Sequence, residues 1–169
     1  MPATHQIPKG ARVLPTPDWF TSVLTSAGTF VNPGGSKFSQ VALFNNATDG
    51  RYLFIYGLSV GSPSGKFACY PLTTPNGAVV SSGFPIRSDV GASPGQIYVY
   101  NSSSPPPEYL TFLTSNALDI QGEDIENPLL YFPGFPLQVL PPGMAFVVSE
   151  TSASANSVSI TFWWVAMKP

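Results

Sequence analysis

Short apolar runs alternate with turn-forming residues along most of the chain. From residue 38 onward, runs rich in Val, Ile, Tyr and Phe are separated by Gly, Pro, Asn and Ser, with a repeat of roughly 8–12 residues. The stronger runs cover residues 39–46, 51–60, 66–72, 77–84, 95–101, 109–115, 143–149 and 157–167, and weaker ones cover 127–132 and 135–140. This pattern predicts an all-β chain of about nine strands in a sandwich or barrel.

The N-terminal part of the chain has a different pattern. Residues 1–15 contain three prolines and few large apolar side chains, so we expect an extended arm. In residues 17–27, apolar side chains recur at spacings of three and four, Asp18 suits the first turn of a helix, and Gly28 can end one. These features predict one short helix over 17–27. We expect this helix and the strands after it to form a single sandwich domain over residues 16–169.

The last predicted strand has two different faces. One face carries Val158, Ile160, Phe162, Trp164 and Ala166, which we assign to the sandwich interior. The other face begins with serines and a threonine and ends with Trp163, Val165 and Met167. A strand that faced water would remain polar to its end. The change predicts that this end is covered, either by a second subunit or by the predicted helix.

Apolar side chains also occupy both faces of the strand predicted over residues 52–56, where Tyr52, Phe54 and Tyr56 alternate with Leu53 and Ile55. Aromatic and Met side chains are enriched in the cores of protein interfaces. We therefore predict an oligomer or partner interface, formed by Trp163, Val165, Met167, Tyr52 and Tyr56.

Composition narrows the classes of function. Only 9% of the residues are charged while 43% are hydrophobic, which suits a protein that places part of its surface against partners. A formal net charge of −2 with scattered Lys and Arg argues against nucleic-acid binding. No apolar run is long enough for a transmembrane helix, and the first residues have no apolar core typical of a secretion signal.

Catalytic chemistry has little support in the sequence. His5 is the only histidine and lies in the predicted arm, and Cys69 is the only cysteine and is flanked by aromatic residues typical of a core. We therefore predict no catalytic residues, no metal and no cofactor. Two weaker alternatives stay open: a calcium loop with acids from Asp119 to Glu126, and a sugar-stacking platform formed by Tyr98, Tyr100 and Tyr109.

The segments VALFNNATDGRYLFIYGLSV and FPLQVLPPGMAFVVSETSASANSVSITFWW suggest a family. Their order is an apolar strand, an Asn/Gly turn and a second strand, and later Pro142-Gly143, a strand, a Ser/Ala-rich hairpin and the aromatic pair Trp163-Trp164. This order resembles jelly-roll structural proteins of tailed bacteriophages, which decorate or cement capsids or form fibres. The chain departs from this resemblance by continuing with VAMKP after the aromatic pair.

The resemblance implies a jelly-roll sandwich that binds the outer surface of a phage head as a homotrimer. It implies a non-enzymatic virion protein, assembled in the host cytoplasm, whose partner is the major capsid protein or another virion protein. The alternative is a receptor- or glycan-binding module of a phage tail or head fibre.

Overall fold

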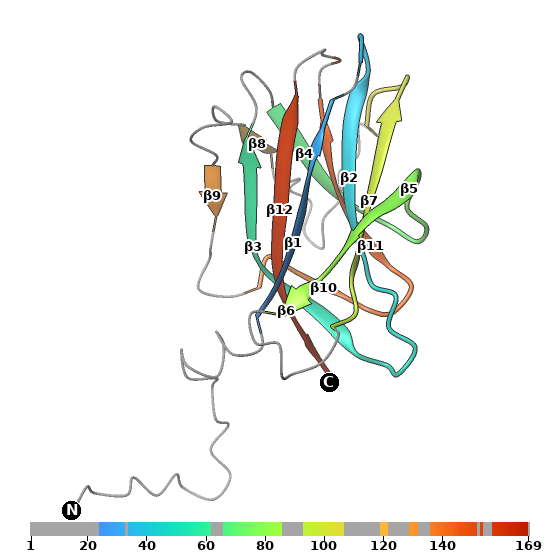
Figure 1. Cartoon of the computed structure of the whole chain (residues 1–169), viewed down its shortest axis with the longest axis vertical. Helices are drawn as coiled ribbons and strands as arrows, with labels where there is room; N and C mark the ends of the chain where they lie inside the picture. Colours follow the sequence, from blue (N-terminus) through green and yellow to red (C-terminus); the bar gives the residue numbers. More distant parts are fainter. Residues whose placement is uncertain are drawn as a thin grey trace, which may run out of the picture.

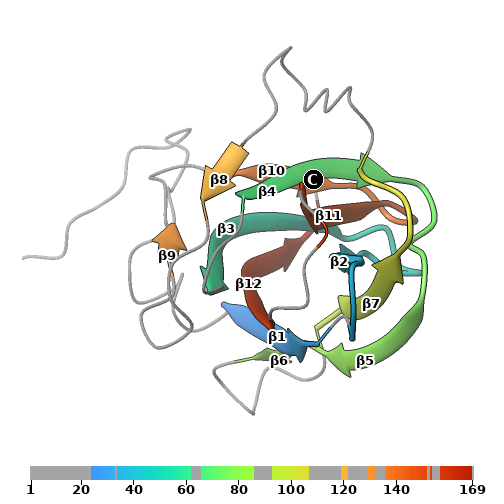
Figure 2. The same cartoon turned by 90° about the horizontal axis from the view of Figure 1, so that it is seen from above.

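The computed structural model describes residues 24–32, 34–61, 66–85, 93–106, 119–121, 129–131, 136–151, 153 and 157–168. Within these residues the chain forms β-strands and no helix. Figure 1 shows the strands in two layers, and Figure 2 shows both layers curving around a shared interior. The prediction of an all-β chain with two antiparallel sheets is confirmed.

Each sheet contains six strands of the described part of the chain. The front sheet has the order β10-β3-β12-β1-β6, with β9 also paired to β3, and the back sheet has the order β5-β7-β2-β11-β4-β8. The front strands are β1 (Thr25–Val31), β3 (Tyr52–Gly61), β6 (Phe84–Pro85), β9 (Leu129–Tyr131), β10 (Gln138–Leu140) and β12 (Val158–Met167). The back strands are β2 (Phe38–Phe44), β4 (Lys66–Leu72), β5 (Ala78–Ser82), β7 (Gln96–Ser102), β8 (Asp119–Gln121) and β11 (Ala145–Glu150).

The strand predictions agree closely with these elements. Every described strand of five residues or more, except β1, overlaps a segment whose alternation predicted it. The predicted strand over 109–115 lies outside the described residues. The run over 77–84 is divided between two sheets, because β5 pairs with β7 and β6 pairs with β1. This segment passes from the back sheet to the front sheet and closes one side of the sandwich (Figure 1).

The helix predicted over 17–27 is wrong at its C-terminal end. Residues 25–27 belong to β1, which pairs along its whole length with β12. The strand buries Thr25, Ala27 and Val31 on one face. Residues 25–27 adopt strand structure because pairing with a long buried strand outweighs the weak helical spacing of their side chains. Residues 17–23 and the predicted arm over 1–15 lie outside the described residues.

Gly28 does not end a helix but allows two strands to approach closely. A methyl group at Gly28 would overlap the side chain of Thr161 and would lie 2.7 Å from the carbonyl oxygen of Ile160. Glycine in a strand often marks such a close backbone approach. Gly28 is therefore required by the packing of β1 on β12.

The acidic segment at 119–126, considered above as a calcium loop, begins with a strand and not with a loop. Residues 119–121 form β8, whose backbone pairs with residues 66–68 of β4 at the edge of the back sheet. The remaining acids, from residue 123 onward, lie outside the described residues.

The core lies between the sheets and is aliphatic and aromatic. Its largest fully buried side chains include Trp164, Phe67, Phe146 and Phe162. The rings of Phe146 and Phe162 meet edge to face across the two sheets, with centroids 6.1 Å apart. Cys69 is fully buried among them, as its aromatic flanks predicted.

The face that β3 presents to the core changes halfway along the strand. Trp163 lies opposite Gly57, but Trp164 lies opposite Ile55, so Tyr56 is an extra residue in β3. The fully buried positions change from odd to even numbers across this bulge: Leu53 and Ile55 precede it, and Leu58 and Val60 follow it. A β-bulge changes which side chains point to a given face of the sheet. Here the bulge allows apolar side chains from both halves of β3 to point into the core.

Trp164 fills a slot that is lined in part by glycine backbone. Its indole Nε1 donates a hydrogen bond of 2.9 Å to the carbonyl oxygen of Pro94. A methyl group at Gly95 would lie 2.9 Å from Trp164 Cε2, and one at Gly83 would lie 2.7 Å from Cη2. Gly95 also has a φ of 131°, which side-chain-bearing residues rarely adopt. The slot therefore requires glycine at both positions.

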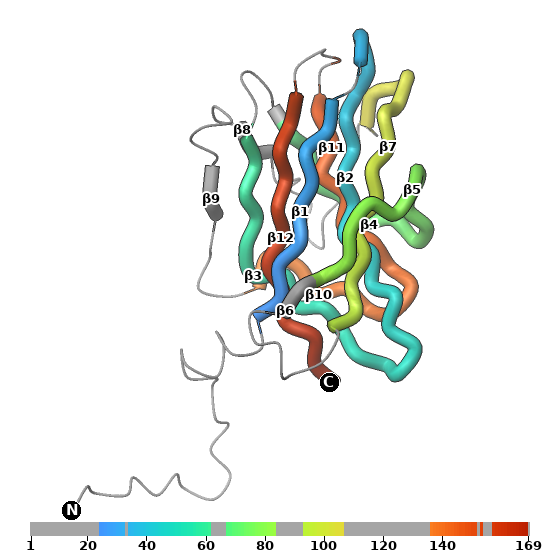
Figure 3. Tube along the Cα trace, viewed as in Figure 1, coloured from blue at the N-terminus to red at the C-terminus, as the bar shows by residue number. Residues whose placement is uncertain are grey.

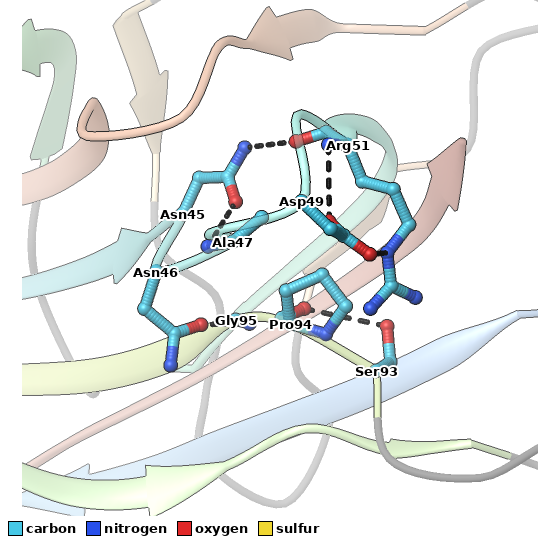
Figure 4. Close-up of polar contacts among 8 residues, drawn as sticks. All are labelled: Asn45, Asn46, Ala47, Asp49, Arg51, Ser93, Pro94 and Gly95. Atoms are coloured by element: carbon cyan, nitrogen blue, oxygen red, sulfur yellow. Dashed lines mark hydrogen bonds and ion pairs between the residues drawn. The ribbon is translucent and has the colours of Figure 1, made fainter. Parts of the chain in front are cut away.

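A fully buried asparagine organises the turn that follows β2. Asn45 donates through Nδ2 to the carbonyl oxygens of Arg51 and Leu140, each at 2.9 Å, and its Oδ1 accepts from the backbone N–H of Ala47 at 3.0 Å. Figure 4 shows this turn, with the exposed Asp49–Arg51 ion pair and the bond from the Gly95 N–H to Asn46 Oδ1. The turn thus joins β2, β3, β10 and the tryptophan slot.

Candidate functional site: the outer patch of the front sheet

The five predicted interface residues lie on the outer face of two adjacent strands. Met167 pairs with Tyr52, and Val165 pairs with Phe54, in the antiparallel ladder between β12 and β3. Because paired residues point to the same side of a sheet, these side chains share the face opposite the core. The outer patch consists of Tyr52, Phe54, Tyr56, Trp163, Val165 and Met167.

The bulge in β3 shapes the outer patch. On β12, Trp163 has two small cross-strand neighbours, Ser26 on β1 and Gly57 on β3. The extra residue, Tyr56, is half-buried and lies between the buried Ile55 and Gly57, the residue opposite Trp163. Small neighbours do not bury a large ring, and the indole is only half-buried. The patch therefore contains two half-buried aromatic residues, Tyr56 and Trp163, on neighbouring strands.

Exposure differs among the residues of the patch. All except Val165 are half-buried, and none carries a charge. Val165 is only 1% exposed in the isolated chain, although it lies on the outer face. Phe54 was noted in the sequence pattern but was not assigned to the interface, and Val139 of β10 extends the patch because it pairs with Phe54. Strand pairing across the sheet is the only signal that could have identified Val139.

The tyrosines proposed as a sugar platform do not share a common environment. Tyr98 is half-buried, and its ring packs edge to face on Phe44 with centroids 5.8 Å apart. Tyr100 is 39% exposed, and Tyr109 lies outside the described residues. The described part of the chain therefore presents one exposed ring here.

One buried acid was not foreseen from the sequence. Glu150, at the end of β11, is 1% exposed, and its Oε2 accepts a 3.1 Å hydrogen bond from the backbone N–H of Ser39. The register places Glu150 on the core side, next to Ser39, whose hydroxyl has no partner among the described residues.

The described ranges were also searched for metal-binding clusters and membrane-spanning helices. They contain no group of three or more His, Cys, Asp or Glu side chains that could hold a metal ion. A search of the same ranges for a helix long and apolar enough to cross a bilayer finds none. Comparisons with protein families, with curated proteins and with solved structures find no match to this chain.

Two tyrosines link the stability of the fold to alkaline pH. Burial raises the pKa of Tyr70 above its ordinary value of 10.0, although a hydrogen bond with Ser149 opposes the shift. Burial also raises the pKa of Tyr56 in the outer patch. A raised folded-state pKa means that the unfolded chain ionises first, so this contribution to stability is complete below pH about 10 and is lost as pH rises through the folded pKa.

We therefore expect the melting temperature to fall above pH about 10, and the fall to be smaller in Tyr70→Phe. Thermal melts of both proteins across this range, followed by circular dichroism, measure the difference. Parallel curves for the two proteins would show that Tyr70 does not contribute to the alkaline loss.

Proposed function

We propose that the chain is a non-enzymatic structural protein that assembles with copies of itself and with a larger partner through the outer patch. The observation that supports this proposal most strongly is the gathering of half-buried aromatic and Met side chains on the outer face of β3 and β12. Interface cores are enriched in these residue types and depleted in charge. A solvated sheet face would instead carry polar residues.

The partner that we propose is the shell of a bacteriophage. The sequence resemblance to decoration and cement proteins supports it, as does the low charge of the chain. In this proposal the sandwich is a jelly roll, it attaches to the outer surface of the head as a homotrimer, and the major capsid protein is its partner. No catalytic step is assigned to it.

The virion role is tested by cosedimentation of the purified chain with intact phage particles that lack it. We expect stoichiometric retention of the chain, and a marked loss of retention for Trp163→Ala, because a central aromatic side chain commonly contributes about 2 kcal/mol or more to an interface. Tyr100→Ala, on the back sheet, is the matched control and should be retained like the unaltered chain. If the unaltered chain fails to sediment with particles but binds a glycan array, the receptor-binding alternative replaces this proposal.

A further inference from the structure

The strand β5 lies at one end of the back sheet, and its outer edge is open. It pairs with β7 on one side, and no described strand pairs with its other side. Figure 3 shows β5 at the side of the sandwich, beyond β7. Residues 78–80 are all exposed, although successive side chains of a strand point to opposite faces of the sheet. A strand with neighbours on both sides and one covered face buries every second residue, so three consecutive exposed residues indicate an open edge.

The other terminal strands of the two sheets have features that hinder pairing with a further strand. β6, β8 and β10 contain only two or three residues each. Pro85 lies in β6, Asp119 lies in β8, and Pro141 directly follows β10. Short length, proline and charge are common protections of a sheet edge. β5 has five residues without proline or charge, and Gly77 and Gly83 flank it, so it is the least protected of the terminal strands described.

A bulge in β5 places two valines in solvent. The register against β7 shifts between Val79 and Ser81, which makes Val80 the extra residue. Val79 is 45% exposed and Val80 is 50% exposed. A bulge can protect an edge by twisting it, but this one leaves both apolar side chains uncovered. The apolar area of the two valines therefore favours the addition of another strand.

The charge of this edge indicates which strand fits it. Residues 67–86, which contain β5, include no charged side chain, and neither does β7. Like charges directly opposite each other destabilise a strand pair, but a neutral edge meets an identical edge without this cost. Two antiparallel β5 strands related by a two-fold axis also make every contact twice. A second copy of the chain therefore matches β5 in charge, polarity and length.

We infer that β5 pairs with the β5 strand of a second copy in antiparallel order, so that the two back sheets become continuous. The contact buries Val79 and Val80 and gives hydrogen-bond partners to the outward backbone groups of both strands. It lies on the back sheet, whereas the outer patch lies on the front sheet, so it goes beyond the proposed function. A two-fold contact closes a pair and not a trimer. In the proposed virion assembly it links neighbouring oligomers.

The test is light scattering of the full-length chain with Trp163→Ala, which weakens association through the outer patch. Two five-residue strands make a small contact, so we expect the mass to rise from 18.0 kDa toward twice that value only at high protein concentration. Adding Val80→Lys brings like charges together, and the same rise should then need about tenfold more protein. Val80→Glu should have the same effect. A one-to-one mixture of these two variants should regain the association, since opposite charges then meet.

A control and a second measurement locate the contact. Ala153→Lys adds the same charge at an exposed position after β11, which β2 and β7 separate from β5, and it should leave the association unchanged. Amide hydrogen exchange is measured on the Trp163→Ala chain without an edge substitution. The backbone amides of residues 78–82 should exchange more slowly as the protein concentration rises.

Four results would each contradict the inference. The Trp163→Ala chain could keep a mass of 18.0 kDa at every concentration, or Val80→Lys could leave its association unchanged. The mixture of the Lys and Glu variants could associate no better than either variant alone. Concentration-dependent slowing of exchange could be confined to strands other than β5. None of these results contradicts the proposed function, which is tested by particle binding and by the difference between the unaltered chain and Trp163→Ala.

Discussion

Replacing Trp164 with alanine is expected to lower the free energy of unfolding by about 3–5 kcal/mol, the range for truncation of large core side chains. The indole is fully buried, and the backbone of Gly83 and Gly95 lies against it, so on that side no side chain can move inward to fill the space. The substitution also leaves the carbonyl oxygen of Pro94 without its indole donor.

Chemical denaturation followed by far-ultraviolet circular dichroism measures this loss. The neighbouring Trp163→Ala is the matched control, because Trp163 is half-buried on the opposite face and its removal opens no core cavity. We expect Trp163→Ala to cost clearly less than Trp164→Ala. Equal losses for the two variants would contradict the assignment of the two faces of β12.

The second large effect is expected for Asn45→Ala, which should cost roughly 2–4 kcal/mol because several buried polar groups lose their partners together. The amide of Asn45 makes three hydrogen bonds, and the residue is fully buried. Its removal leaves two carbonyl oxygens and one N–H of the turn unsatisfied.

Asn45→Asp distinguishes lost packing from lost hydrogen bonding. It keeps the shape and the acceptor for Ala47 but replaces the Nδ2 donor with an oxygen that faces two carbonyl oxygens. We expect it to destabilise the fold at neutral pH at least as much as Asn45→Ala, as measured by the same denaturation curves. Asn46→Ala is the control, since Asn46 is exposed and makes one bond, to the Gly95 N–H. An Asn45→Asp protein as stable as the unaltered chain would rule out the hydrogen-bonding role.

Much of this fold could be predicted because alternate residues of a β-strand point to opposite faces of the sheet, so the sequence pattern shows which face is buried. The interior assignment of Trp164 and Phe162 is confirmed by their full burial, and the predicted strands pair where the alternation placed them. The gathering of the predicted interface residues on one face follows from the same period, once β3 and β12 are known to be neighbours. Their role as an interface stays a prediction.

The features that the sequence did not predict all depend on contacts between segments that are far apart in the chain. The bulge at Tyr56 adds one residue to a ladder, and nothing in the local sequence marks where β12 makes the register change. The glycine slot for Trp164 is formed by residues that are far from it in the chain. The strand character of residues 25–27 depends on pairing with β12, which is more than 130 residues away, as the partnership of Ala27 with Phe162 illustrates.

The central claim, that the outer patch is an assembly surface, is tested most directly by light scattering of the unaltered chain and Trp163→Ala over a wide range of concentrations. The account predicts that the mass of the unaltered chain rises from 18.0 kDa toward a multiple of it. For Trp163→Ala it predicts that the same rise needs about thirtyfold more protein, the equivalent of about 2 kcal/mol. A mass of 18.0 kDa for the unaltered chain at every concentration, or identical curves for the two proteins, would contradict it.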